Sequence, residues 1–271
     1  MKYSVLMSVY QKEKAQYLED ALESIFRQSV PSDDIVLVCD GPLTPSLEEV
    51  IRKMRLTYGD ALRPVRLEKN MGLGNALNEG IRHCRHELIA RMDSDDISYP
   101  DRCEKQLKVF SSMPEVSICS GVIEEFSEDP ARTTSRRVLP QYHAEILQFA
   151  KSRNPFNHPC VMYRKSAVLT AGSYQDFYLL EDYYLWLRML QNGCIGYNLQ
   201  EPLLHMRAGS DMYLRRSGWR YAKSQRALFR YMKDHQMISR SRYLKSCLIR
   251  SCSSLAPNWL RKGMFHLFLR K

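Results

Sequence analysis

Residues 88–96 read LIARMDSDD, an apolar run that passes directly into a turn with three aspartates. The run has the length of a buried strand, and Asp93, Asp95 and Asp96 follow where that strand would end. Carboxylates crowded in this way repel one another unless a cation or hydrogen-bond donors compensate them. A hard divalent ion such as Mn²⁺ or Mg²⁺ would do so through carboxylate oxygens. The other interpretation is a cap for the helix that starts near Pro100, for which one acidic residue is enough.

Strand-like and helix-like stretches alternate on both sides of this turn. Continuous apolar runs predict strands, and apolar residues spaced three to four apart predict helices. The alternation predicts an α/β fold with a mostly parallel central sheet flanked by helices. Residues 127–138 are polar and are expected to form an exposed loop. The expected strands are 4–10, 35–39, 64–67, 88–92, 116–121 and 159–163, and the expected helices are 17–26, 47–58, 73–84, 100–113, 142–151, 166–171 and 180–192.

Three loops should share one edge of this sheet. Ligands of parallel α/β sheets bind at the carboxyl ends of the strands, which selects residues 10–14, 40–44 and 93–96. Tyr10 and Asp40 therefore become candidates for nucleotide contact beside the acidic turn. Asp40 precedes Gly41-Pro42, so an ordinary turn aspartate is the other interpretation.

Further candidates lie downstream. Glu181 and Asp182 open a helix, where they could complement the helix dipole or take a proton from an acceptor hydroxyl. Trp186, one turn later, could offer its face to a sugar or fill the core. His158 and His205 are isolated histidines, which are more often structural than catalytic, but their titration range makes both worth testing.

The basic charge of the chain belongs to its C-terminal part. The net charge is +10, yet residues 206–271 hold 16 Lys and Arg against 2 Asp and Glu, and residues 1–205 hold 24 against 28. Aromatic residues interleave with these cations, which suits nucleic acid, anionic lipid or the acidic main domain. Residues 259–270 form an imperfect amphipathic helix, which could lie on a membrane surface or be a solvated cap. We therefore divide the chain into a domain at 1–209 and a basic helical tail at 210–271.

Other features limit the class of protein. Eight scattered cysteines without a Cys-x-x-Cys pair suit a reducing compartment and argue against a zinc site. No apolar stretch approaches the roughly 20 residues that span a bilayer. We expect a cytoplasmic protein, or one that lies on a membrane surface.

Five segments in order resemble glycosyltransferase family 2, in its bacterial polysaccharide branch. They are 4–10, 38–42, 70–80, 90–102 and 180–182. Segment 90–102 looks like the family's Asp-x-Asp-Asp signature with its following Pro-x-Arg, and 180–182 looks like its Glu-Asp base motif. The resemblance extends from Tyr3 to about Gly209. It implies a nucleotide-sugar-binding fold of the GT-A type and an inverting, metal-dependent transfer of a hexose or N-acetylhexosamine.

The resemblance also implies roles for single residues. Asp40 would contact the base of the nucleotide, Asp93 the ribose, and Asp95 the metal that bridges the diphosphate. Asp182, beside Glu181, would deprotonate the acceptor. Arg91 could lie near the diphosphate or pair with an acidic residue on the sheet. The remaining assignments are Tyr10, His158 and Trp186 to the nucleotide-sugar, His205 to the metal, and Asp96 to support of the turn.

The family's commonest donor nucleotide is UDP, so a UDP-sugar is expected. If the tail docks on a membrane, the acceptor would be a saccharide on a lipid diphosphate. The protein would then act in O-antigen or capsule assembly at the inner face of the bacterial cell membrane, without nucleic acid. Three alternatives stay open: a nucleic-acid-binding protein that uses the basic tail, a sugar nucleotidyltransferase, and a degenerate relative that binds sugar without turnover.

Overall fold

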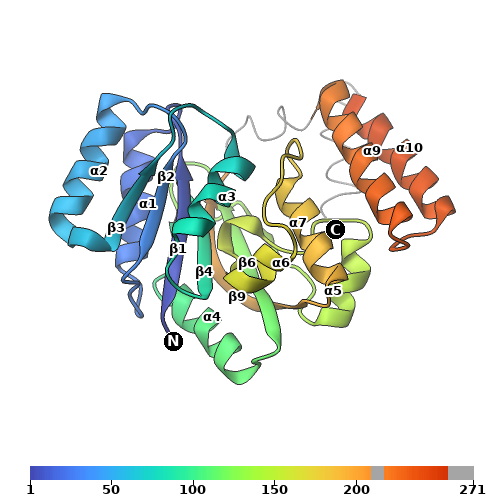
Figure 1. The fold of residues 1–271 in the computed structure, drawn as a ribbon, viewed down its shortest axis with the longest axis horizontal. Coiled ribbons are helices and arrows are strands. Elements are labelled where there is room, and N and C mark those ends of the chain that lie inside the picture. Colours follow the sequence, from blue (N-terminus) through green and yellow to red (C-terminus); the bar gives the residue numbers. More distant parts are fainter. Residues whose placement is uncertain (209–216, 256–271) are drawn as a thin grey trace.

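A mixed β-sheet runs through the centre of the computed structural model, which describes residues 1–208 and 217–255. Helices cover both faces of the sheet, and the last two helices lie at one end of the molecule (Figure 1). Of the nine strands in these residues, eight follow the order β3-β2-β1-β4-β8-β6-β9-β5, and the ninth, β7, pairs with β6. This is the α/β class that the alternating sequence pattern predicts.

The first four strands are parallel, as the sequence predicts. Val9 of β1 pairs with Cys39 of β2, and Ser8 pairs with Asp93 of β4. The loops that follow β1, β2 and β4 therefore share one edge of the sheet. The elements are β1 (Tyr3–Val9), α1 (Ala15–Phe26), β2 (Ile35–Cys39), α2 (Pro45–Tyr58), a 3-10 turn (Gly59–Ala61), β3 (Leu62–Arg66), α3 (Leu73–His83) and β4 (Leu88–Asp93).

The other half of the sheet is mixed. β8 (Met162–Arg164) lies antiparallel between β4 and β6 (Val116–Phe126). β9 (Ile195–Arg207) is parallel to β6 and antiparallel to the short β5 (Ile97–Ser98). The sequence pattern predicts neither β5 nor β9.

Two expectations about this half need correction. The predicted strand 159–163 begins as a 3-10 turn, His158–Cys160, because Pro159 has no N–H to donate to a strand ladder. The predicted loop 127–138 contains β7 (Ser135–Arg137), which pairs with β6. The helices of this half are α4 (Arg102–Ser112), α5 (His143–Ala150), α6 (Lys165–Thr170) and α7 (Glu181–Gln191).

Two apolar clusters pack against the two faces of the sheet. Alternate residues of β1 serve both, since Val5 lies in the cluster that includes α1, α2 and α4, and Leu6 in the cluster that includes α3 and α7. Among the described residues, Trp186 of α7 is the largest fully buried side chain.

The C-terminal part described is a helical hairpin, α9 (Gly218–Asp234) and α10 (Arg240–Leu255). Leu228, Phe229 and Met232 of α9 join the cluster around α7. Within the described ranges, no helix is both long and apolar enough to cross a membrane. The predicted boundary at 209/210 and the predicted amphipathic helix at 259–270 lie outside the described residues.

Candidate active site

The three aspartates of the acidic turn converge at the end of β4. One carboxylate oxygen from each of Asp93, Asp95 and Asp96 lies within 4.8 Å of the others. Burial, together with the charges of Asp93 and Glu13, raises the pKa of Asp95 to about 7. Burial and the neighbouring carboxylates also raise the pKa of Asp96 well above its usual range. The turn is therefore short of positive charge at neutral pH.

Asp96 has one oxygen engaged and one free. Its Oδ1 accepts a hydrogen bond from the backbone N–H of Arg207 at 2.8 Å. Its buried Oδ2 finds no hydrogen-bond partner in the part of the chain that the structure describes. A buried carboxylate oxygen without a donor is costly unless a cation approaches it. Three convergent carboxylates with such an orphan oxygen fit a hard cation such as Mn²⁺ or Mg²⁺.

Arg91 is the buried cation behind this turn. It is 1% exposed, and both terminal nitrogens donate to Asp93, with Nη1 3.0 Å from Oδ2. The sequence leaves open whether Arg91 lies near the diphosphate or pairs with an acidic residue on the sheet. In the structure it pairs with Asp93 of the same strand. The charge of Arg91 also lowers the pKa of Asp95 and of Glu181 against the larger effect of burial, so both carboxylates lie within its electrostatic reach.

Asp40 organises a neighbouring loop. Its two carboxylate oxygens accept hydrogen bonds from the backbone N–H groups of Met71 (2.7 Å) and Gly72 (3.0 Å), directly before α3. Gly41 has a positive φ of 87°, and a Cβ there would lie 2.7 Å from the Asn70 nitrogen. Asp40 is therefore held at the rim by backbone donors. Tyr10 directly follows β1, the strand next to β2 in the sheet, and its side chain is exposed.

Glu181 and Asp182 occupy the first turn of α7. Asp182 accepts hydrogen bonds from Asn154 Nδ2 at 2.6 Å and from the Tyr183 backbone N–H at 2.7 Å, which fix its carboxylate. Burial and the charge of Asp182 raise the pKa of Glu181 to about 7. A Cβ added to Gly74 of α3 would lie 3.4 Å from the Glu181 Cβ, so the starts of α3 and α7 touch.

Trp186 belongs to the core rather than to a sugar-binding surface. It is 0% exposed, and the rings of Phe156, His158, Tyr163 and Tyr174 surround it. The prediction that Trp186 contacts the nucleotide-sugar is therefore wrong, because a fully buried indole has no face to offer.

His158 is held in the same aromatic group. Its Nε2 lies 2.9 Å from the Tyr174 hydroxyl. Burial, helped by the charge of Arg91, holds the pKa of His158 well below its usual range, so the ring is neutral. A neutral imidazole that is hydrogen-bonded inside the protein fits a structural role for His158. Its contact with the nucleotide-sugar stays a prediction.

His205 lies on β9 and faces a different group of side chains. Its ring stacks on Tyr99 with centroids 4.4 Å apart, and its Nδ1 is 3.8 Å from Glu124 Oε2. Among the described residues, the group that could share one metal ion contains the three aspartates and does not include His205. The structure therefore gives its assignment as a metal ligand no support.

The sequence pattern does not identify two residues that contact the turn. Arg207, at the end of β9, donates from Nε to the Asp95 carbonyl at 3.1 Å, and its guanidinium lies over the Tyr17 ring. Glu13 accepts a hydrogen bond from Ser94 at 2.8 Å. Glu13 falls in the rim loop 10–14, which the strand order does select. Arg207 enters the sequence analysis only through the basic charge of residues 206–271, because the sequence pattern does not predict β9.

Comparison with known proteins places this geometry in context. Residues 4–171 match the family described as Glycosyl transferase family 2. The chain is 44% identical to the amylovoran biosynthesis glycosyltransferase AmsE of Erwinia amylovora over 258 residues, 94% of each chain. It is 36% identical to the UDP-Gal:alpha-D-GlcNAc-diphosphoundecaprenol beta-1,3-galactosyltransferase of Escherichia coli, over 100% of this chain and 97% of that one.

Solved structures share the fold. The S. aureus TarS fragment 1–349 in complex with UDP-GlcNAc superposes with a TM-score of 0.69 and 17% identity, over 99% of this chain and 76% of the fragment. The chain spans 46% of the length of the longer TarS structure. The arrangement of sheet and helices is therefore the GT-A type.

Proposed function

Because the chain belongs to glycosyltransferase family 2, we propose that it moves a hexose or N-acetylhexosamine from a UDP-sugar to a lipid-linked saccharide, with inversion and with a divalent metal. The observation that carries this proposal is the convergence of Asp93, Asp95 and Asp96 at the rim, with Glu181 of α7 within electrostatic reach of the same buried Arg91 that pairs with Asp93.

The donor would lie along the rim between β2 and β4. Asp40 would face the base and Asp93 the ribose, with Tyr10 beside them. Support for a uridine nucleotide comes from two comparisons: the TarS fragment that shares the fold is complexed with UDP-GlcNAc, and the Escherichia coli relative is named for UDP-Gal. Asp93 is already oriented by Arg91, so little ordering would be needed when a ribose hydroxyl donates to it.

The metal would be held by Asp95 with its neighbours in the acidic turn. Bound Mn²⁺ or Mg²⁺ supplies positive charge that stabilises the nucleoside diphosphate as it leaves. Asp96, tied to the Arg207 backbone through one oxygen, would keep the turn in shape.

The acceptor hydroxyl would be activated at the start of α7. Asp182 would take the proton while the hydroxyl oxygen attacks the anomeric carbon from the face opposite the diphosphate, which inverts that centre. Asn154 orients this carboxylate through the 2.6 Å hydrogen bond. Glu181, with a pKa raised to about 7, is the second candidate for the proton.

The relatives support a place in bacterial surface polysaccharide synthesis. One is named for amylovoran and the other for a diphosphoundecaprenol-linked GlcNAc acceptor. We extend this to an O-antigen or capsule repeat unit, assembled on a diphosphate lipid at the inner face of the cell membrane. A sugar nucleotidyltransferase would also use aspartates on a rim, but it would leave the carboxylates of α7 without a task.

A donor screen tests the proposal. The protein is incubated with MnCl₂, a panel of nucleotide-sugars and a synthetic GlcNAc-diphosphate-lipid acceptor, and the products are analysed by mass spectrometry. We expect a new glycosidic bond from a UDP-sugar, free UDP, and no turnover in EDTA. Release of pyrophosphate, or turnover that ignores EDTA, would contradict the proposal.

A further inference from the structure

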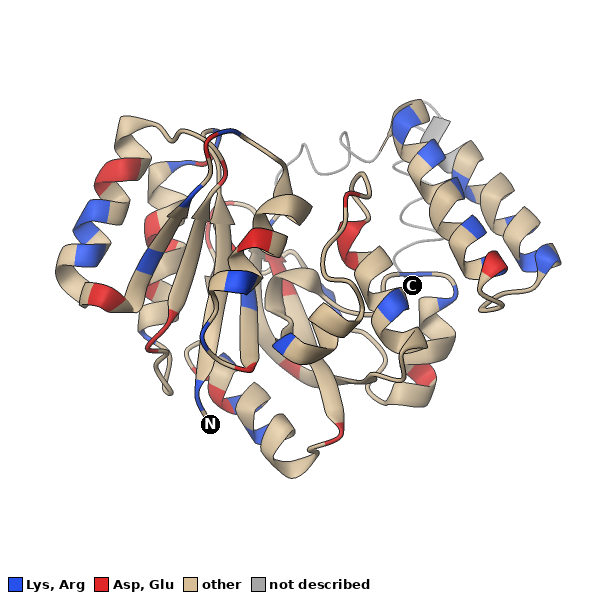
Figure 2. Ribbon diagram, in the orientation of Figure 1, with Lys and Arg blue, Asp and Glu red and all other residues tan. Residues whose placement is uncertain are grey.

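The hairpin of α9 and α10 directs positive charge to solvent. Residues 218–255 include nine Lys and Arg and a single acidic residue, Asp234, and basic residues mark both helices in Figure 2. Lys223, Arg226 and Arg230 are exposed along one side of α9. None of these three has an ion-pair partner among residues 1–208 and 217–255. These three cations therefore form no ion pair with the described part of the main domain.

α10, which packs against α9, exposes large aliphatic side chains. Leu244 is 65% exposed, Leu248 68% and Ile249 49%, within less than two turns of helix. The other side of α10 is the one that packs, since Tyr243 and Cys247 contact the cluster around α7. Large aliphatic groups gathered on the outer side of a packed helix mark an interaction surface.

The hairpin touches the segment that leads into α7. Ser224 of α9 donates a hydrogen bond to the Tyr178 carbonyl at 2.8 Å, and the Arg220 guanidinium lies 4.0 Å from the centroid of the Tyr178 ring. Tyr178 precedes Glu181 by three residues. Whatever the hairpin binds would therefore be held near the start of α7, where the carboxylates proposed to activate the acceptor lie.

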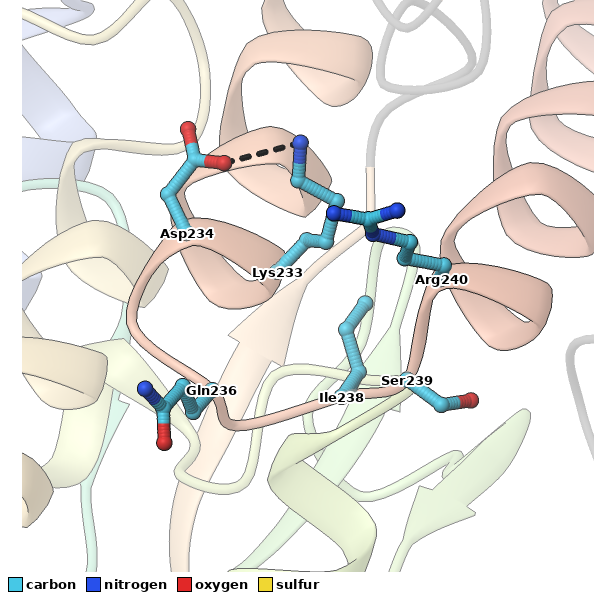
Figure 3. Close-up of a pocket in the computed structure, with 6 residues that line it drawn as sticks. All are labelled: Lys233, Asp234, Gln236, Ile238, Ser239 and Arg240. Carbon is cyan, nitrogen blue, oxygen red and sulfur yellow. Dashed lines mark ion pairs between the residues drawn. The ribbon is translucent and has the colours of Figure 1, made fainter.

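Positive charge continues to the far end of the hairpin. A hollow of about 620 Å³ lies at the turn between α9 and α10, and Lys233, Gln236, Ser239 and Arg240 are among the residues that line it (Figure 3). Lys233 pairs with Asp234 at 2.8 Å, whereas Arg240 has no ion-pair partner in the described part of the chain. Cations are therefore spread over the whole length of the hairpin.

We propose that the hairpin docks on an anionic phospholipid bilayer. The docking surface, as we define it, consists of Lys223, Arg226 and Arg230 on α9 and Leu244, Leu248 and Ile249 on α10. Aliphatic side chains would enter the headgroup boundary while the cations meet anionic headgroups. Nucleic acid would engage the cations but leave the leucines in water, so lipid fits both halves of the surface. The inference rests on the proposed function, because a lipid-linked acceptor resides in a bilayer.

Co-sedimentation of the full chain with vesicles tests the docking surface. Vesicles of phosphatidylcholine alone are compared with vesicles that also contain phosphatidylglycerol, across a salt series. We expect binding to require phosphatidylglycerol and to weaken with salt. The triple variant Lys223→Gln, Arg226→Gln, Arg230→Gln should bind on the order of a hundredfold more weakly, since each cation contributes about 1 kcal/mol. The double variant Leu244→Ser, Leu248→Ser should lose about tenfold or more.

α2, at the opposite end of the sheet, offers matched controls (Figure 1). The triple variant Arg52→Gln, Lys53→Gln, Arg55→Gln removes the same charge, and Leu56→Ser alters a leucine that is 75% exposed. Both controls should bind as the wild type does. Unchanged binding in both hairpin variants, or equal losses in the α2 controls, would overturn the proposal. So would binding to DNA or RNA in place of vesicles.

A second readout separates this inference from the proposed function. Transfer to a short-chain, water-soluble acceptor should be unchanged in the hairpin variants. If the wild-type protein binds vesicles but transfers no sugar to either acceptor, the proposed function fails and the docking surface stands. If it transfers sugar but ignores anionic vesicles, the docking surface fails alone.

Discussion

Arg91 and Asp93 pair within one strand, the guanidinium inside the sheet and the carboxylate at the strand's end. The side chain of Arg91 is 1% exposed and that of Asp93 35%. The desolvated cation is thus compensated by a carboxylate that still reaches the rim. This pair anchors the acidic turn to β4.

The two halves of this pair should differ in their effect on stability. Asp93→Asn leaves a buried cation uncompensated and should lower the free energy of unfolding by about 3–5 kcal/mol. Arg91→Met frees a carboxylate that can still meet water, so its cost should be smaller. Urea unfolding of both variants measures the difference, and a larger loss in Arg91→Met would contradict the arrangement.

Asp95→Ala should remove metal-dependent nucleotide binding. The variant loses the carboxylate placed between Asp93 and Asp96, and with it a ligand of the proposed metal site. Titration calorimetry of UDP with MnCl₂ should show at least a tenfold weaker affinity. Asp60→Ala, at an exposed position beyond α2, serves as the control. Equal UDP affinity in Asp95→Ala and the wild type would exclude Asp95 as a ligand.

The raised pKa of Asp95 has a consequence for stability. In EDTA the folded carboxyl keeps a proton that the unfolded chain releases near pH 4, so its contribution to stability falls as the pH rises from about 4 to about 7. Asp95→Asn should therefore become more stable relative to the wild type across that window. Thermal unfolding in EDTA measures this difference. A relative stability that stays flat from pH 4 to pH 8 would refute it.

Substitutions on α7 should separate binding from turnover. Asp182→Asn should keep UDP binding and lower kcat by at least a hundredfold, as expected for loss of a general base. The pKa of Glu181, about 7, predicts that Glu181→Gln alters the pH dependence of kcat/KM near neutrality. Assays at saturating MnCl₂ keep Asp95 out of that profile. Full activity in Asp182→Asn would refute its assignment as the base.

Trp186 should matter for stability and not for donor affinity. Trp186→Ala leaves a cavity between four aromatic rings and should cost about 3–5 kcal/mol. Trp186→Phe should cost less, because the indole Nε1 makes no hydrogen bond within the described residues. The KM for the donor should be unchanged in Trp186→Phe. A tenfold rise in that KM would restore a binding role.

The sequence predicts the parallel half of the fold because each of its strands is a short apolar run between turn residues. β9 lacks that signal: its segment contains Asn198, Glu201 and Pro202, and its pairing with β6 shifts register near them. Strand formation there depends on the neighbouring β6 rather than on local periodicity. Missing β9 also meant missing Arg207, whose backbone binds Asp96.

For the site, local pattern identifies the acidic turn and the carboxylates of α7. It does not reveal how far each side chain is buried. Trp186 has the same one-turn spacing from Asp182 whether it faces a ligand or the core, and only the packing of Phe156 and Tyr174 against it decides. Asp40 shows the same limit, because its backbone partners lie about 30 residues away in the chain.

The start of α3 contacts both Asp40 and Glu181. Asp40 accepts a hydrogen bond from the backbone N–H of Gly72, directly before the helix, and Gly74 in the first turn packs against Glu181. Further along, Gly80 is pressed onto the sheet so closely that a Cβ would lie 2.4 Å from Leu6 Cδ1. The contacts with Asp40 and with Glu181 are thus both at the start of α3, and its later turns are packed against the sheet. A nucleotide that shifts the Asp40 loop would therefore move the start of α3 against Glu181, so donor binding and the position of that carboxylate are expected to be coupled.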